Sequence, residues 1–192
     1  MKVCRIDEPC DERPYFFVID EINRGNLSKI FGELLMLIES DKRGEKYALR
    51  LLYADEQFSV PANIHIIGMM NTADRSLAMI DYALRRRFAF FDMEPAFQSD
   101  GFKARQNINQ NLKFDSLIVT VESLNKVIAE DASLGGGFRI GHSYFCASEV
   151  VDDEWLSSVV EYELIPLLQE YWFDEPSKVE SWALRLRGAI RG

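Results

Sequence analysis

The stretch Tyr15-Phe16-Phe17-Val18-Ile19-Asp20-Glu21-Ile22-Asn23-Arg24 decides the fold, because five large apolar residues run without alternation and stop at two carboxylates. An uninterrupted apolar run of this length predicts a parallel β-strand that is covered on both faces. Ligands bind outside the carboxyl ends of the strands in a parallel sheet. Asp20 and Glu21 are therefore expected at the mouth of a ligand-binding crevice in an α/β fold.

Adjacent carboxylates at such a strand end suit two chemical tasks. Asp20 can hold a hydrated Mg²⁺, a cation that prefers oxygen ligands, and Glu21 can orient or deprotonate an attacking water. This is the Walker B pattern of ATPases and GTPases. The alternative reading of the same residues is a strand end that is merely solvated by two acids.

Length and composition limit the possible classes of protein. The chain has 192 residues, which suits one domain or a domain and a half. Its net charge of −9 disfavours a surface that grips DNA or anionic lipid. No apolar run approaches the ~20 residues that span a bilayer. Three scattered cysteines and two histidines argue against a zinc site or a disulfide framework, and a cytoplasmic location is expected.

A second strand with a polar tip follows along the chain. Asn26 is expected to cap a helix over residues 27–40, and residues 47–53 and 57–60 are expected to form a hairpin. Residues 64–70 are mostly apolar and lead directly into Asn71. Both strands end in polar side chains that can contact a phosphate or the water that attacks it. The sequence therefore predicts one crevice shared by Asp20, Glu21 and Asn71.

Three consecutive arginines close the α/β part. Ser76 is expected to cap a short helix that ends in Arg85-Arg86-Arg87, and residues 88–91 are expected to form a third short strand. Basic residues at a helix C-terminus offset the macrodipole, which accounts for one arginine. Three together in an acidic protein indicate a cluster directed at an anionic group.

Helical patterns dominate after Glu94-Pro95. A weak helix is expected over residues 102–112, and a stronger one is expected to be capped by Asp115 or Ser116. Gly135-Gly136-Gly137 is expected to be a connector, since no Lys-Ser/Thr follows it as in a phosphate cradle. Further helices are expected from Asp152-Asp153, with an end or kink at Pro166, and from Pro176, and the basic end at 185–192 is expected to fray.

Taken together, these motifs resemble the McrB family, the AAA+ GTPase subunits of the modified-cytosine-specific restriction system. The resemblance lies in residues 17–28 (FVIDEINRGNLS), 70–78 (MNTADRSLA), 81–88 (DYALRRRF) and 138–145 (FRIGHSYF). It implies a partial AAA+ parallel-sheet core over residues 1–96, followed by an α-helical lid over residues 97–192.

The resemblance also implies roles for individual residues. Asp20 would serve Mg²⁺ through water, Glu21 the lytic water, and Asn71 the sensing of the γ-phosphate or that water. One of Arg86 and Arg87 would be an arginine finger that enters the neighbouring subunit's site. Arg139 would be the lid's phosphate sensor, or else a surface arginine. The remaining residues implied at the subunit boundary are Asn23, Arg24, Asp74, Arg75 and Arg85.

One large departure separates this sequence from a complete AAA+ protein. It contains no Walker A loop of the form GxxxxGK[ST], and the family's DNA-reading domain does not appear in it. We therefore expect the isolated chain neither to bind nor to hydrolyse GTP appreciably, although Mg²⁺ and GTP would be bound by the full-length protein. DNA is expected to be contacted by other domains. The implied partners are further copies in a ring, expected to be hexameric, and an McrC-like nuclease subunit.

Two other functions are compatible with these residues. A MoxR-type AAA+ ATPase that remodels protein complexes shares the strand-tip chemistry but differs in nucleotide and client. A truncated, non-catalytic remnant that only binds sister subunits or the nuclease is the other. Comparing GTP with ATP turnover distinguishes the first of these from an McrB-type GTPase.

Overall fold

A computed structural model describes residues 13–52, 54–71, 73, 85–146 and 150–191. The chain divides into two compact units, Met1–Phe91 and Asp92–Gly192, which are treated separately below. Among the described residues, no helix is long and apolar enough to cross a membrane.

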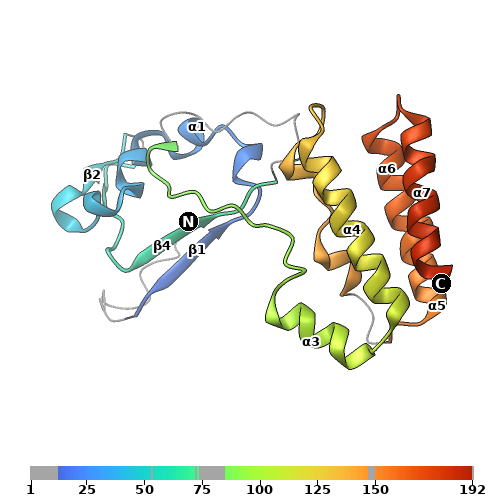
Figure 1. Cartoon of the computed structure of the whole chain (residues 1–192). Helices are drawn as coiled ribbons and strands as arrows, with labels where there is room; N and C mark the ends of the chain where they lie inside the picture. The colour runs from blue at the N-terminus through green and yellow to red at the C-terminus, as the bar shows by residue number, and fades with distance from the viewer. Residues whose placement is uncertain (1–12, 53, 72, 74–84, 147–149, 192) are drawn as a thin grey trace. The chain divides into compact units, whose positions relative to one another are not determined.

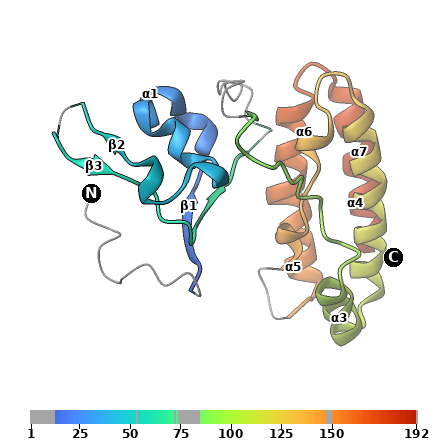
Figure 2. The same ribbon diagram turned by 90° about the vertical axis from the view of Figure 1, so that its left-hand side faces the viewer.

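The first unit is built on a pair of parallel strands, as the apolar runs predict. Strand β1 (Tyr15–Ile19) pairs with β4 (Ile64–Gly68), with Tyr15 opposite Ile64 and Ile19 opposite Gly68. The chain between them passes through helical segments and a small hairpin (Figures 1 and 2). The parallel register brings the carboxyl ends of both strands to the same edge of the sheet.

The prediction that β1 is covered on both faces is wrong for this chain. Phe16 is 63% exposed and Val18 is 52% exposed. In the described part of the chain this sheet contains β1 and β4 alone, and the buried core beside it consists of Ile22 and Leu27 with a few partly buried neighbours. The apolar faces of β1 therefore have too little described polypeptide to cover them.

The segment after β1 is helical but less regular than predicted. Asn26 caps α1 (Leu27–Phe31) by accepting from the Lys29 backbone N–H at 2.9 Å. Gly32 then takes a positive φ of 49°, so the expected continuous helix breaks there. The remainder consists of the 3₁₀ segments η2 (Gly32–Ile38), η3 (Ser40–Lys42) and η4 (Glu45–Tyr47), with η1 (Ile22–Arg24) before α1.

The hairpin is present, whereas the third strand is not. Strands β2 (Leu49–Arg50) and β3 (Gln57–Phe58) pair antiparallel and are shorter than predicted. Residues 88–91 were expected to form a strand, but they have neither helical nor strand structure. Phe91 is 86% exposed, so no strand is packed over that end of the segment. The helix expected from Ser76 lies mostly outside the described residues.

All regular secondary structure in the described residues of the second unit is helical (Figure 1). Two long helices, α4 (Leu112–Glu130) and α7 (Pro176–Arg191), lie side by side in both views (Figures 1 and 2). The other segments are α3 (Asp100–Asn109), η5 (Gly136–Phe138), η6 (His142–Phe145), α5 (Asp153–Ser158), the π-helix η7 (Val159–Leu164) and α6 (Ile165–Tyr171).

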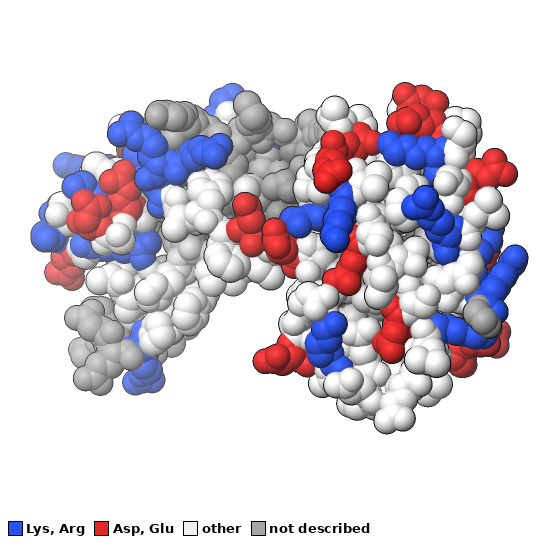
Figure 3. Space-filling model, viewed as in Figure 1, with Lys and Arg blue, Asp and Glu red and all other residues white. Residues whose placement is uncertain are grey.

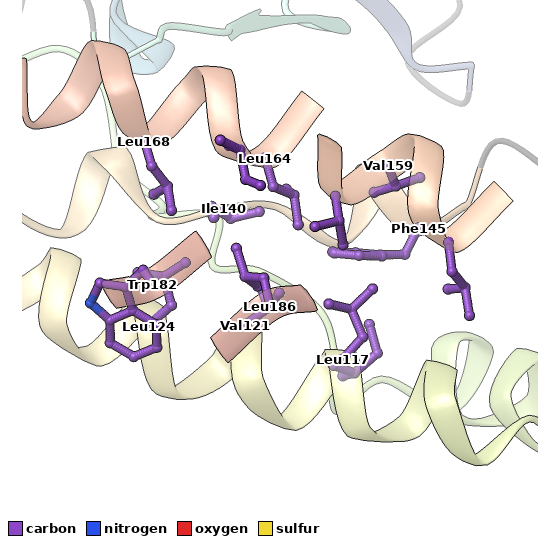
Figure 4. Packing of buried hydrophobic residues seen from close by; sticks show 14 of the residues in the cluster. Leu117, Val121, Leu124, Ile140, Phe145, Val159, Leu164, Leu168, Trp182 and Leu186 are labelled. Atoms are coloured by element: carbon purple, nitrogen blue, oxygen red, sulfur yellow. The ribbon is translucent and has the colours of Figure 1, made fainter. Parts of the chain in front are cut away.

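A single apolar core holds these helices together (Figure 4). Leu117, Val121 and Leu124 on α4 are fully buried, and they face Trp182 and Leu186 on α7 in the same cluster. Fully burying one such side chain contributes about 1.5–3 kcal/mol. The helical unit is therefore stabilised by an apolar core of its own.

The ends of α4 and α7 differ from the predictions. Helix α4 begins at Leu112 rather than near Ser116, because the Asn111 side chain accepts from the backbone N–H groups of Lys113 and Phe114. Helix α7 is not frayed and continues to Arg191. Arg187 anchors its last turns by donating from Nε and Nη2 to the two carboxylate oxygens of Glu161, both at 2.6 Å.

Pro166 alters the hydrogen-bonding pattern of the helix in which it lies. A proline has no N–H to donate to the preceding turn, and its ring crowds that turn. The segment in front of Pro166 is the π-helical turn η7, which joins α5 to α6. Such wider turns are a common way for a helix to absorb a local disruption, so the chain continues as helix through the proline.

Asp131 connects the ends of the three helices α4, α6 and α7 through hydrogen bonds. Its Oδ2 accepts from Lys178 Nζ at 2.7 Å and from Trp172 Nε1 at 2.9 Å. Its Oδ1 accepts from the backbone N–H and the hydroxyl of Ser133. The Lys178 ammonium is the main cause of a strongly lowered pKa of the Asp131 carboxyl, and Ser133 and Trp172 add to it.

Replacing Asp131 with Asn is expected to lower the free energy of unfolding of the helical unit by about 2–3 kcal/mol, since hydrogen bonds to a charged group are lost. Because the folded-state pKa is lowered, the contribution is complete at neutral pH, begins to fall below about pH 4, the unfolded range for Asp, and is lost only when the pH passes the lowered folded-state pKa. Urea unfolding followed by tryptophan fluorescence measures this, since Trp155, Trp172 and Trp182 all lie in the helical unit.

Asp153 supplies the matched control for Asp131. It pairs with Lys113 at 2.6 Å, but its side chain is 68% exposed. Exposed pairs contribute about 0–1 kcal/mol, so Asp153→Asn should change stability little. Equal effects of the two substitutions would contradict the anchoring role of Asp131.

Candidate functional site

The backbone turns sharply where β1 ends. Glu21 has φ 50° and ψ 45°, a left-handed conformation that is uncommon for a residue other than glycine. Its N–H donates to Asp20 Oδ1 at 2.9 Å. Such conformations cluster at functional sites, and here the turn places two exposed carboxylates directly beyond the sheet edge.

The end of β4 is bonded to this turn. Met69 N donates to Ile19 O at 2.8 Å, and Ile22 N donates to Met69 O at 2.9 Å. The Asn23 side chain then donates to the backbone oxygen of Asn71 at 3.4 Å. The chain segments carrying Asp20, Glu21 and Asn71 therefore meet at one edge of the sheet.

Gly68 lies against the Ile22 side chain at this close junction, and sequence reasoning did not single it out. A Cβ at Gly68 would lie 2.6 Å from Ile22 Cδ1, closer than carbon atoms pack. A glycine as the last residue of a strand, where β1 and β4 are bonded to each other, is the signal that marks such an approach.

The site side chains are held by neighbours in their own segments. Glu21 Oε2 lies 2.6 Å from Arg24 Nε, and Asn71 Oδ1 accepts from the Ala73 N–H at 3.0 Å. Both interactions are exposed, and exposed ion pairs contribute only about 0–1 kcal/mol. A bound ligand can therefore replace either partner at small cost.

The donors at this edge fit a magnesium ion held through water. Mg²⁺ keeps several waters and takes one or two carboxylates from a protein, and Asp20 is an exposed carboxylate with one oxygen on the Glu21 N–H. Among the described residues there is no cluster of three or more histidine, cysteine, aspartate or glutamate side chains that could hold a metal alone.

The three arginines have different surroundings. Arg87 Nε lies 2.9 Å from Glu39 Oε1, and both side chains are partly buried. The Arg85 guanidinium lies 5.6 Å from the centre of the Phe90 ring. Arg85 and Arg86 are exposed. Glu39 is a second residue that sequence reasoning missed, because the two partners lie far apart along the chain.

The other predicted site residues are spread over the chain. Asn23 and Arg24 lie in η1, beside Glu21, whereas Asp74 and Arg75 lie outside the described residues. Arg139 belongs to the helical unit, where both of its terminal nitrogens lie 3.3 Å from Glu94 Oε1 and its Nε donates to Gly136 O.

Charge is mixed over the visible surface. On the face in Figure 3, acidic and basic side chains are interspersed on each unit, without a continuous basic stripe. The sequence carries 31 acidic and 22 basic residues. Nucleic-acid-binding faces usually show clustered Lys and Arg, so this face does not have that character.

Comparison with known proteins gives matches to both units. Residues 2–88 match the family model of the AAA domain (dynein-related subfamily). Residues 116–180 match the model of the McrB alpha-helical lid domain.

Two relatives are similar over different lengths. The chain is 48% identical to the type IV methyl-directed restriction enzyme EcoKMcrB subunit of Escherichia coli K12, over 96% of this chain and 42% of that protein. It is 32% identical to the type II restriction enzyme BsuMI component YdiS of Bacillus subtilis 168, over 42% of this chain and 27% of that protein. The alignments therefore span less than half the length of either relative.

Proposed function

This chain belongs to the McrB family of AAA+ proteins, and we propose that it supplies the water-activating edge and the helical lid of a GTP-hydrolysing motor subunit. The observation that carries this proposal is the junction of the β1 and β4 ends, which brings Asp20, Glu21 and Asn71 to one sheet edge. Phosphoryl transfer depends mainly on positioning and charge neutralisation, and a shared edge supports both.

Each polar group at the edge has a proposed task. Asp20 holds Mg²⁺ through water, and that ion neutralises charge on the phosphates when bound. Glu21 orients the attacking water and takes up its proton. Asn71 donates from its amide to the γ-phosphate or to the same water without adding negative charge. For these tasks Glu21 must leave Arg24, whereas the Asn71 amide N–H groups are not used by the bond that its Oδ1 accepts from the Ala73 N–H.

We assign the trans-acting finger to Arg86 rather than Arg87. A finger must extend outward across a subunit boundary, and the Arg87 side chain is only 21% exposed. Arg86 is exposed. Arg85, Asn23, Arg24, Asp74 and Arg75 are proposed at the same boundary.

We propose Arg139 as the residue of the lid that senses a phosphate. Its terminal nitrogens already bind an anionic oxygen, that of Glu94. Paired donors of this kind match phosphate as well as carboxylate. A polyphosphate that displaces Glu94 would therefore meet a guanidinium whose Nε is fixed on Gly136 O.

The proposed biological setting is restriction of DNA that carries modified cytosine. The name of the Escherichia coli relative describes a methyl-directed restriction enzyme. The motor would work as a ring of copies, proposed to be hexameric, with an McrC-like nuclease subunit. DNA would be contacted by other domains, in keeping with the acidic composition of this chain.

An ATP-driven remodeller of MoxR type is the competing function, because the matched AAA model belongs to a broad subfamily. The two functions can be distinguished by the rates of GTP and ATP hydrolysis. The measurement needs a protein in which this chain is joined to a Walker A loop. We expect GTP to be hydrolysed in preference to ATP. Preferential hydrolysis of ATP would contradict the GTPase assignment.

The 192-residue chain alone is expected to show no appreciable GTP binding. The loop that would surround the phosphates is missing from its sequence, and most of the binding energy for a nucleotide is directed at the phosphates. Isothermal titration of the chain with Mg²⁺-GTP measures this. Micromolar binding, about −8 kcal/mol, would contradict the expectation.

A further inference from the structure

Residues 138–145 form a second feature of the chain, which the proposed hydrolysis does not use beyond Arg139. Three of their side chains, at a spacing of three residues, contact residues 94–97, the segment that leads into the helical unit. We refer to residues 94–97 as the lead-in segment. The three contacting side chains are Arg139, His142 and Phe145.

The central contact is a hydrogen bond to the backbone. Ala96 N donates to His142 Nδ1 at 3.1 Å, in a part-buried position. The imidazole ring also packs edge-on against Phe97, at 6.4 Å between ring centres, and against Phe102, at 6.3 Å. Because Nδ1 accepts, the proton of the neutral ring must be on Nε2.

The contacts on either side are apolar and ionic. The Phe145 and Phe97 rings lie 5.9 Å apart, and these side chains are 0% and 2% exposed. The Arg139 guanidinium lies 3.3 Å from Glu94 Oε1 at the outer end of the lead-in segment. The segment is therefore held at three successive points along its length.

Residues 138–145 are themselves fixed to the helices. The buried Asn125 side chain on α4 accepts from Ile140 N at 2.6 Å and donates to Ile140 O at 2.9 Å. Arg105 Nε on α3 donates to Phe145 O at 2.9 Å. Forces on the lead-in segment are thereby passed to α3 and α4 through hydrogen bonds.

Among the described residues, the chain just before the lead-in segment has few such contacts. Phe88 packs with the small core of the first unit, and Phe90 lies beside Arg85. By contrast, Phe91 and Met93 are each 86% exposed, and residues 91–93 have neither helical nor strand structure.

We propose that residues 138–145 are a clamp that makes the lead-in segment part of the helical unit, with His142 as its positioning residue. The chain then pivots at residues 91–93, ahead of Glu94, rather than at the first helix, α3. Any movement that begins in the first unit would be transmitted to α3 and α4 through the contacts of the clamp. This inference does not depend on which nucleotide is hydrolysed, or on whether one is.

Hydrogen exchange of the 192-residue chain tests the clamp without nucleotide. His142→Ala removes the acceptor for the Ala96 N–H, so exchange at Ala96 should rise about 5–10-fold, since one hydrogen bond contributes about 1 kcal/mol. Arg139→Ala should raise it by less, since its pair with Glu94 is exposed. The other histidine of the chain, His65, gives the matched control, and His65→Ala should leave Ala96 unchanged.

A second measurement covers the case in which His142→Ala fails to fold. Nitrogen NMR of the unsubstituted chain reports the tautomer of each imidazole, and the clamp requires the Nε2–H form of His142. A protonated Nδ1, unchanged exchange at Ala96 in folded His142→Ala, or slow exchange at residues 91–93 in the unsubstituted chain would each overturn the proposal.

Discussion

Replacing Glu21 with Gln is expected to leave nucleotide binding intact and to abolish turnover in a protein that joins this chain to a Walker A loop. Glutamine keeps the size and the hydrogen-bonding reach of the side chain but cannot accept a proton from water. General base catalysis contributes about 10²–10⁴-fold in rate, and a loss in that range or beyond is expected in kcat. Binding of a GTP analogue and single-turnover hydrolysis measure the two effects separately.

The matched control is Glu56→Gln on the hairpin of the same unit. Glu56 is an exposed acid that lies in the turn between β2 and β3. Its replacement should change neither binding nor turnover. If Glu21→Gln hydrolyses GTP at the normal rate, Glu21 is not the base and the Walker B assignment of this edge is wrong.

Replacing Arg86 with Ala is expected to slow an assembled ring by about 10³–10⁵-fold, the usual contribution of an arginine finger, or roughly 4–7 kcal/mol of barrier. The guanidinium neutralises charge that develops on the phosphates of the neighbouring site. Steady-state hydrolysis at saturating GTP measures the change.

Mixing subunits tests whether this arginine acts in trans. A Glu21→Gln subunit still offers Arg86 to its neighbour, and an Arg86→Ala subunit still has its own Glu21. Each variant alone should be inactive, and their mixture should regain activity. A mixture that stays inactive although mixed rings form would show that Arg86 acts within its own subunit.

Substitutions at two further arginines, Arg87 and Arg50, complete this series of tests. Arg87→Ala should have a smaller effect than Arg86→Ala, because Arg87 is held by Glu39. Arg50, which pairs with Asp55 on the exposed hairpin, is the control, and its replacement should have none. If Arg86→Ala and Arg87→Ala both leave turnover unchanged, the finger lies elsewhere.

Local chemistry explains which parts of the fold were predictable. The apolar runs of β1 and β4 lead to a parallel pair, and Asn26 and Asp152 cap helices as their side chains favour. The helical core follows from the spacing of apolar residues such as Val179 and Trp182 on α7. Each apolar run and each capping residue is a pattern of residues that lie close together in the sequence.

The features that were missed depend on distant partners. Coverage of the two faces of β1 requires helices packed on the sheet, which a strand's own sequence does not specify. The pairing of Arg87 with Glu39 joins residues 48 positions apart, and the bond from Ala96 to His142 joins residues 46 positions apart. The start of α4 at Leu112 was missed because Asn111, Asp115 and Ser116 are all competent caps, and tertiary contacts choose among them.

The meeting of the two strand ends was predicted, whereas the side-chain contacts at that edge were not. The junction of the two strand ends follows from parallel pairing. The ion pair of Glu21 with Arg24 and the turn of Asn71 onto Ala73 do not follow from it, since each is one of several exposed arrangements of similar energy. A ligand is needed to select among them.

The central claim is that Glu21 and Asn71 serve one water beside the γ-phosphate. A structure of the protein that joins this chain to a Walker A loop, with Mg²⁺ and a non-hydrolysable GTP analogue, tests it directly. The account predicts that the Glu21 carboxylate and the Asn71 amide both lie about 2.6–3.2 Å from that water. A γ-phosphate bound away from this edge, with Glu21 still paired with Arg24, would contradict it.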